Sequence, residues 1–216
     1  GMDVVSGGEY KRARDAGVDG GRIVFSGVGK TREEMALAIK NGIRQFNVES
    51  ETELKVLNEV ALSLCAIAPI TLRVNPDVDA KTHAKIATGK SENKFGIPIA
   101  KSQEVYATAA SMEGIEVVGI DVHIGSQLTD LEPFRLAYEK VAELTKTLRQ
   151  DGHNIRRLDL GGGLGIDDEN PIDFEKLNTE LKSLDTDIEI YIEPGRFLVS
   201  EAGILISKVT QIKQKD

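Results

Sequence analysis

The sequence has very little cysteine and few aromatic residues. It contains one cysteine, no tryptophan and 5% aromatic residues among 216 residues. One cysteine cannot form an intramolecular disulfide, so a disulfide-stabilised secreted fold is excluded and a reducing cytoplasm is the expected location. Cys65 lies in an apolar run typical of a helix, Val60–Ala68, and we expect it to be a core residue and not a nucleophile.

Long apolar runs and a surplus of positive charge are also lacking. No apolar run approaches the roughly 20 residues of a membrane-spanning helix, and the N-terminus has no signal-peptide pattern. The net charge is −8, from 27 Lys and Arg against 35 Asp and Glu. This balance argues against nucleic acid and anionic membranes as partners.

The sequence does contain a regular alternation of short apolar runs and longer periodic ones. Seven strands are expected, at Asp3–Ser6, Arg22–Gly27, Gln45–Glu49, Ile70–Asn75, Val117–Ile124, Arg157–Leu160 and Ile188–Glu193. Helices are expected at Glu9–Ala16, at Thr31–Asn41, from Ser50 onwards, and at Ser102–Ser111, Leu131–Gln150 and Asp173–Leu184. Two of them begin with a capping box, Thr31 with Glu34 and Ser50 with Glu53. This order predicts parallel strands joined by helical crossovers.

An open sheet and a (β/α) barrel both fit that order, and the pattern within the strands favours the barrel. One face of each strand is polar, with Asp3, Asn47 and Glu49, Arg73 and Asn75, Asp121 and His123, Asp159, and Tyr191 and Glu193. The alternate positions are apolar, as in Phe46 and Val48. Strands of an open parallel sheet are apolar on both faces, whereas barrel strands carry polar groups near the C-terminal mouth.

Two glycine-containing segments follow the sixth and seventh expected strands. Leu158–Ile166 contains three consecutive glycines, whose backbone N–H groups an anion can approach closely. Glu193–Arg196 reads Glu-Pro-Gly-Arg. Phosphate sites in such barrels often follow strands seven and eight, so we expect the first of eight strands to be missing.

Together, the ordered motifs resemble one family. They are Asp3–Glu9, Ser26–Thr31, Phe46–Ser50, Leu72–Pro76, Asn93–Gly96, His123–Gln127, Leu158–Ile166 and Glu193–Arg196. The chain is similar over essentially its whole length to the diaminopimelate decarboxylases, pyridoxal-phosphate enzymes of the alanine racemase-like barrel fold. The resemblance implies decarboxylation of meso-diaminopimelate to lysine, a small amino-acid substrate, and a homodimer.

The resemblance also implies roles for single residues. His123 resembles the histidine that stacks on the cofactor ring, and Glu193 resembles the carboxylate beside the pyridine nitrogen. Ser126 and the backbone of Gly161, Gly162 and Gly163 resemble the phosphate cradle.

Four further residues are implied less directly. Gly195 and Arg196 resemble cofactor contacts, and Arg196 also suits a substrate carboxylate because its guanidinium is planar. Asp3 and Arg73 resemble residues that contact the cofactor or support its site, and both roles stay open. His83 and Lys94 are expected to be structural.

The sequence departs from the family in two respects. The lysine that would carry the cofactor covalently belongs to the first barrel strand, and no such strand precedes Asp3. Lys30 matches a different motif and is not its substitute. The family's C-terminal β domain is also absent, so we expect a partial barrel at 1–203 and a segment leading towards that domain at 204–216. The chain alone is expected to be inactive, with only non-covalent cofactor binding and a weak or non-native dimer.

Three alternatives stay open. A decarboxylase of the same fold could act on ornithine, arginine or a carboxylated polyamine. A barrel that binds pyridoxal phosphate without catalysis is a second alternative. A generic phosphate-binding barrel is the third.

Overall fold

A computed structural model describes residues 1–78, 95–167, 169, 171–182, 184 and 187–212. Its strands are β1 (Met2–Val4), β2 (Ile23–Phe25), β3 (Gln45–Val48), β4 (Ala68–Asn75), β5 (Ile97–Pro98), β6 (Ile115–Asp121), β7 (Arg157–Asp159) and β8 (Glu189–Tyr191). All pairings between them are parallel, in the order β1-β2-β3-β4-β6-β7-β8, and the short β5 pairs with β4 alone.

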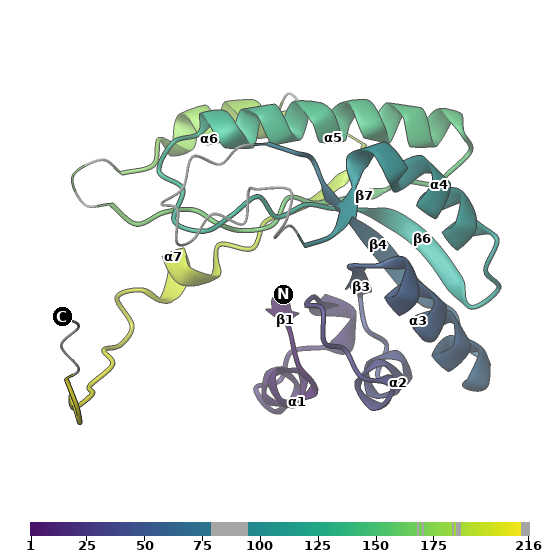
Figure 1. The fold of residues 1–216 in the computed structure, drawn as a ribbon, viewed down its shortest axis with the longest axis horizontal. Helices are drawn as coiled ribbons and strands as arrows, with labels where there is room; N and C mark the ends of the chain where they lie inside the picture. Colours follow the sequence, from purple (N-terminus) through teal and green to yellow (C-terminus); the bar gives the residue numbers. More distant parts are fainter. Residues whose placement is uncertain (79–94, 168, 170, 183, 185–186, 213–216) are drawn as a thin grey trace.

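All helices but the last connect these strands and lie on the outside of the curled sheet (Figure 1). The helices are α1 (Gly7–Asp15), α2 (Arg32–Lys40), α3 (Glu51–Ser63), α4 (Ile99–Ala110), α5 (Glu132–Gln150), α6 (Phe174–Lys182) and α7 (Gly195–Val199), with a 3-10 turn at Gly20–Arg22. The architecture is an incomplete (β/α) barrel, as the strand pattern predicted. The sequence did not predict β5 or α7, which are only two and five residues long.

The expected capping boxes explain where two helices begin. Thr31 accepts a hydrogen bond from the Glu34 N–H, and the Glu34 carboxylate accepts from the Thr31 N–H at 2.9 Å, so this box is complete. At α3, Ser50 accepts from the Glu53 N–H at 3.2 Å. The Glu53 carboxylate accepts instead from the Glu49 N–H at 3.0 Å, so the second box is only half formed.

The two faces of the sheet differ as the alternation predicted. Apolar side chains on the outer face are buried under the helices, among them Phe25, Phe46, Leu72, Ile120 and Leu158. The inner face buries polar side chains, among them Gln45, Asn47, Thr71, Asp121 and Asp159. Buried polar groups need partners, so this inner face must form a hydrogen-bonded network.

The sheet is not closed within the described residues. β1 pairs only with β2, and β8 pairs only with β7. A cavity of about 800 Å³ lies between these two strands, and both contribute to its lining.

The expectation for Cys65 was wrong. Helix α3 ends at Ser63 and β4 begins at Ala68, so the apolar run Val60–Ala68 does not form one helix. Cys65 follows the C-cap residue Leu64, has a φ of +50° and is exposed. The left-handed turn after the helix directs its side chain away from the core.

Two other expectations concern His83 with Lys94, and the segment at 204–216. His83 and Lys94 lie outside the described residues. In the tail, residues 204–212 form no strand with the described sheet, and Ile204 and Leu205 are 88% and 95% exposed. Among the described helices, none combines the length and apolar character needed to cross a membrane.

Candidate active site

The loops that follow β6, β7 and β8 are joined by backbone hydrogen bonds at the C-terminal mouth of the sheet. The Glu193 N–H donates to the Gly161 carbonyl at 2.8 Å, and the Leu128 N–H donates to the Gly163 carbonyl at 2.9 Å. Gly162 also donates from its N–H to Nδ1 of His123, at 3.3 Å. Three segments far apart in the sequence therefore meet at one place, as the resemblance implied.

The three consecutive glycines are required by this close approach. A Cβ at Gly161 would lie 2.4 Å from the Val122 carbonyl oxygen, and one at Gly162 would lie 2.1 Å from that of Glu193. Gly163 is equally confined, with the Gly125 carbonyl oxygen at 2.3 Å. A side chain at any of these positions would push backbone away, so only glycine lets the loops pack.

The glycine N–H groups are not all available to a ligand. Gly161 donates to Asp159 Oδ1 at 3.2 Å, and Gly162 donates to His123. The Gly163 N–H and the half-buried Ser126 hydroxyl have no hydrogen-bond partner in the described part of the chain. These two donors are the ones free to bind an anion.

Four carboxyl groups, of Asp3, Asp121, Asp159 and Glu193, gather on the inner face of this end of the sheet. Burial raises the pKa of each, and their mutual repulsion raises those of Asp3, Asp121 and Glu193 further. Arg73 is the cation beside them, 3.9 Å from Asp121 through Nε. Lys30 also lowers the pKa of Asp3, but Arg73 is shared with Glu49, so the cations do not neutralise the four carboxyl groups and burial favours their protonated forms.

Glu193 is one residue of this cluster with a strongly raised pKa. Burial, and then Asp159, Asp3 and Asp121, raise its pKa to about 11. Its Oε1 is buried and has no hydrogen-bond partner among the described residues. An unpartnered oxygen on a carboxyl group that retains its proton is a site that a ligand atom could occupy.

His123 is held in one orientation and one charge state. Because Nδ1 accepts the Gly162 N–H, the ring proton must be on Nε2. Although the ring is partly exposed, desolvation and the nearby Arg73 lower its pKa below the usual range. The imidazole is therefore neutral at physiological pH and presents a flat, uncharged ring.

Arg73 and Asp3 have defined partners. Arg73 donates through Nη1 to Glu49 Oε1 at 2.7 Å, and it lies over the Phe95 ring, 5.6 Å from its centroid. Asp3 Oδ1 accepts from the Ser26 hydroxyl at 2.7 Å. Both side chains therefore make interactions that support the site. Asp3 is also a member of the carboxyl cluster, and Arg73 lies beside it.

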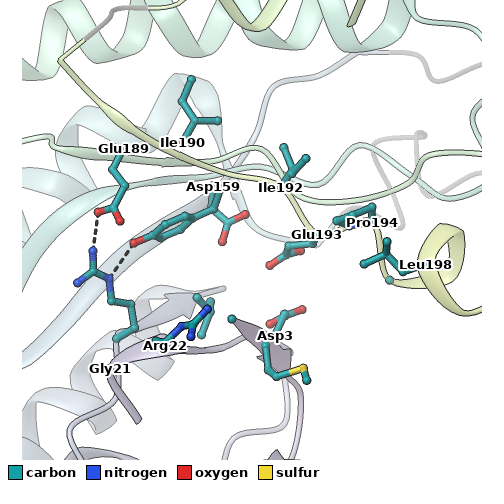
Figure 2. A pocket seen from close by; sticks show the side chains of 16 residues that line it. Asp3, Gly21, Arg22, Asp159, Glu189, Ile190, Ile192, Glu193, Pro194 and Leu198 are labelled. Carbon is teal, nitrogen blue, oxygen red and sulfur yellow. Dashed lines mark hydrogen bonds and ion pairs between the residues drawn. The ribbon is translucent and has the colours of Figure 1, made fainter. Parts of the chain in front are cut away.

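The cavity between β1 and β8 opens onto this cluster. Figure 2 shows Asp3 on one side of it and Asp159 and Glu193 on the other. Gly195 lines the cavity, whereas Arg196 on α7 is exposed, does not line it and has no hydrogen bond or ion pair with another described residue.

No lysine among the described residues lines the cavity. Lys30 is the lysine that most resembles a reactive one because it is buried. All three of its N–H donors are, however, already used in hydrogen bonds. Its Nζ donates to the carbonyls of Gly27 and Asn47 at 2.7 and 2.8 Å, and to Glu53 Oε1 at 2.7 Å. These contacts give Lys30 a structural role.

Two members of the cluster, Asp121 and Asp159, were not predicted as site residues. The strand alternation placed both on the polar face, which was the available signal. Their proximity to Glu193 depends on strand order and curvature, which a sequence pattern does not contain.

Comparison with known proteins agrees with this geometry. A family model described as the pyridoxal-binding domain of pyridoxal-dependent decarboxylases matches residues 1–200. The chain is 47% identical over 221 residues to a diaminopimelate decarboxylase of Haemophilus influenzae, covering 100% of this chain and 53% of that protein.

Solved structures give the same result. The diaminopimelate decarboxylase of Helicobacter pylori complexed with L-lysine has a TM-score of 0.87 at 44% identity, covering 91% of this chain and 51% of that one. The Paramecium bursaria Chlorella virus arginine decarboxylase bound to agmatine has a TM-score of 0.78 at 28% identity, covering 91% and 51%. The chain spans about half the length of the relatives it matches.

Proposed function

Because the chain belongs to the pyridoxal-dependent decarboxylases, through their pyridoxal-binding domain, we propose that it forms the cofactor-binding barrel of a diaminopimelate decarboxylase. That enzyme would convert diaminopimelate to lysine and carbon dioxide, a step of lysine biosynthesis. Since the chain spans about half the length of these relatives, the activity of the whole protein is part of the proposal.

The observation that carries the proposal is the environment of the Glu193 carboxyl group. Its buried Oε1 has no partner among the described residues, and its pKa of about 11 means that it carries a proton. Glu193 could therefore hold a proton at a pyridine nitrogen placed beside it, through a hydrogen bond from its carboxyl group.

The other residues fit the remaining parts of pyridoxal phosphate. The Gly163 N–H and the Ser126 hydroxyl are free donors for a phosphate, and Gly163 lies in a backbone too crowded for any side chain. His123 offers a neutral ring that can lie flat against the cofactor. When bound, pyridoxal phosphate supplies the electron sink for the charge left when carbon dioxide departs.

The chain's own residues would then hold and prepare this group. Glu193 keeps a proton at the ring nitrogen, Asp159 faces Glu193, and Arg73 limits the charge of the cluster. Gly195 and Arg196 would lie at the entrance, where Arg196 is free to meet a phosphate or a substrate carboxylate. Asp3, which accepts a hydrogen bond from the Ser26 hydroxyl, would support the part of the site that holds the cofactor ring.

A titration with pyridoxal phosphate tests the proposed cofactor site. We expect the 216-residue chain to bind it non-covalently, with a change in absorbance, and Glu193→Gln to bind it at least about tenfold more weakly. Inorganic phosphate titrated in parallel should bind far more weakly. Equal affinities for the two ligands would favour a generic phosphate-binding barrel.

The substrate preference is tested by assaying decarboxylation with the longest protein that contains this sequence. We expect lysine and carbon dioxide from meso-diaminopimelate, and little product from ornithine, arginine or a carboxylated polyamine. Preference for one of the latter would favour the decarboxylases related to the viral arginine enzyme. Binding of pyridoxal phosphate without any turnover would favour a non-catalytic barrel.

Two further parts of the proposal concern the oligomeric state and the cellular location of the protein. We expect a homodimer, weakened or non-native for this chain alone, which sedimentation at several concentrations would test. A cytoplasmic location is expected from the single exposed cysteine and the absence of a long apolar helix in the described residues. Fluorescence microscopy of a tagged full-length protein would test it.

A further inference from the structure

Asn47 lies at the centre of a hydrogen-bond network on the inner face of β3. Its side chain is fully buried, and all four of its hydrogen-bonding positions are filled. Oδ1 accepts from Thr71 Oγ1 at 2.6 Å and from Gln45 Nε2 at 3.0 Å. Nδ2 donates to Ser26 Oγ at 3.1 Å and to Asp159 Oδ2 at 3.2 Å. A buried amide with every position matched has one orientation.

The hydrogen bonds of this network run in one direction, towards two carboxyl groups. The Ser26 hydroxyl donates to Asp3, so its oxygen is left to accept from Asn47. At Asp159, Oδ2 accepts from Asn47 and Oδ1 accepts from the Gly161 N–H. Asn47 therefore bridges the two sides of the open sheet, reaching Asp159 on β7 directly and Asp3 on β1 through one hydroxyl.

The donors are distributed unequally between the two acids that face each other. Asp159 receives two N–H donors, whereas Glu193 Oε1 receives none from the described residues. Donors stabilise a carboxylate as the anion, so the proton between Asp159 and Glu193 belongs on Glu193.

We propose that Asn47 is a positioning residue, which fixes Asp159 and thereby decides that Glu193 carries the proton that the two acids share. Its consequence for cofactor binding rests on the proposed function, because Glu193 is the residue proposed to meet the ring nitrogen. Asn47 touches neither substrate nor cofactor in this scheme and acts through Asp159.

The charges around Glu193 are consistent with this route. Asp159 on β7, Asp3 on β1, Asp121 on β6 and Arg73 on β4 all act on it, and Asp159 has the largest effect among them. Burial raises the pKa of Asp159, and the hydrogen bond from Asn47 opposes that rise more than any other group does. Loss of Asn47 should therefore move the proton from Glu193 towards Asp159.

The test is the titration of Glu193 in the 216-residue chain without added ligand. Carboxyl ¹³C NMR follows the labelled glutamates, and Glu193→Gln assigns the signal. In Asn47→Leu, which is close in size but cannot donate, the Glu193 midpoint should fall by about one pH unit or more, the equivalent of one hydrogen bond to a charged group.

A double-mutant cycle separates this role from a merely structural one. In a background of Asp159→Asn, Asn47→Leu should leave the Glu193 midpoint unchanged. Thr71→Val is the matched control, because it removes a buried donor from the other side of Asn47 and should lower stability without moving that midpoint. If Asn47→Leu does not fold, Asn47→Ser replaces it, since the shorter side chain also loses the bond to Asp159.

Two results would overturn the inference. One is an unchanged Glu193 midpoint in a folded Asn47 variant, and the other is an equal shift in Thr71→Val. Affinity for pyridoxal phosphate is the second readout and should fall about tenfold in Asn47→Leu. If the unaltered chain does not bind pyridoxal phosphate, the proposed function fails, but the titration of Glu193 still decides the role of Asn47.

Discussion

Lys30 and Glu53 form a buried ion pair, with Nζ 2.7 Å from Oε1 and side chains that are 0% and 9% exposed. Lys30 follows β2 in the chain and Glu53 is in the first turn of α3, so the pair ties two successive β–α connections together. The lysine also binds the carbonyls of Gly27 and Asn47. Lys30, the described lysine that most resembles a reactive one, therefore stabilises the C-terminal mouth of the sheet.

Replacing Lys30 should therefore destabilise the fold strongly. Lys30→Met would leave Glu53 buried without its cation, whose charge opposes the rise in the pKa of Glu53 caused by burial. We expect a loss of about 3–5 kcal/mol in the free energy of unfolding, measured with urea. Lys40→Met, at an exposed position on α2, is the control and should change it by less than about 0.5 kcal/mol.

The protonated state of Glu193 predicts a dependence of stability on pH. Burial and neighbouring carboxylates raise its pKa from 4.5 to about 11, so between these values the folded chain binds a proton that the unfolded chain does not. Its contribution is complete below about pH 4.5 and is lost as the pH rises through about 11. Stability should fall with pH across this window.

Glu193→Gln removes this titration while keeping the shape of the side chain. The slope of unfolding free energy against pH, measured between pH 5 and 8, should become less negative by up to about 1.4 kcal/mol per pH unit. Glu201→Gln, at an exposed position, should retain the original slope. Equal slopes in all three proteins would mean that Glu193 is ionised in the folded chain.

The role of His123 as a flat, neutral ring predicts how its variants bind pyridoxal phosphate. His123→Ala should weaken binding about tenfold, because an aromatic stacking contact is worth about 1 kcal/mol or more. His123→Phe should retain most of the affinity, since it keeps an uncharged ring. His153→Ala removes a ring that packs against Tyr106 instead and should bind normally. Equal losses in the Ala and Phe variants would contradict stacking.

The crowded glycines predict a steric effect on the site. In Gly162→Ala the new Cβ would meet the Glu193 carbonyl oxygen at 2.1 Å, so the loop after β8 must move. We expect a loss of about 2 kcal/mol or more in stability, together with loss of pyridoxal phosphate binding. Gly29→Ala, where a Cβ would have no atom within 4 Å, should be tolerated in both assays. A normal melting temperature for Gly162→Ala would show that the loops do not pack this closely.

Local patterns in the sequence predicted most of the elements. The seven main strands lie where the apolar runs placed them, and the capping residues Thr31 and Ser50 begin α2 and α3 as expected. Such features depend on residues a few positions apart, so a sequence contains them. The miss at Cys65 has the same origin, because an apolar run does not say where a helix gives way to a turn.

The sequence identified only some residues of the candidate site, and it did not reveal the contacts between them. Motifs identified His123, the three glycines and Glu193, and the structure brings them together at one mouth. The sequence did not reveal that Gly161 and Gly162 use their N–H groups within the protein, or that Asp159 faces Glu193. These contacts depend on strand order and on the curvature of the sheet.

The sequence by itself determined the alternation of strands and helices, the polar inner face and the family, because period, composition and motif are properties of the chain. The tertiary structure alone decided which acid carries a proton. That outcome depends on burial, on the summed field of carboxylates from three strands and on the donors that Asn47 and Gly161 supply. Free energies of this kind arise only when distant residues are brought within a few ångströms of one another.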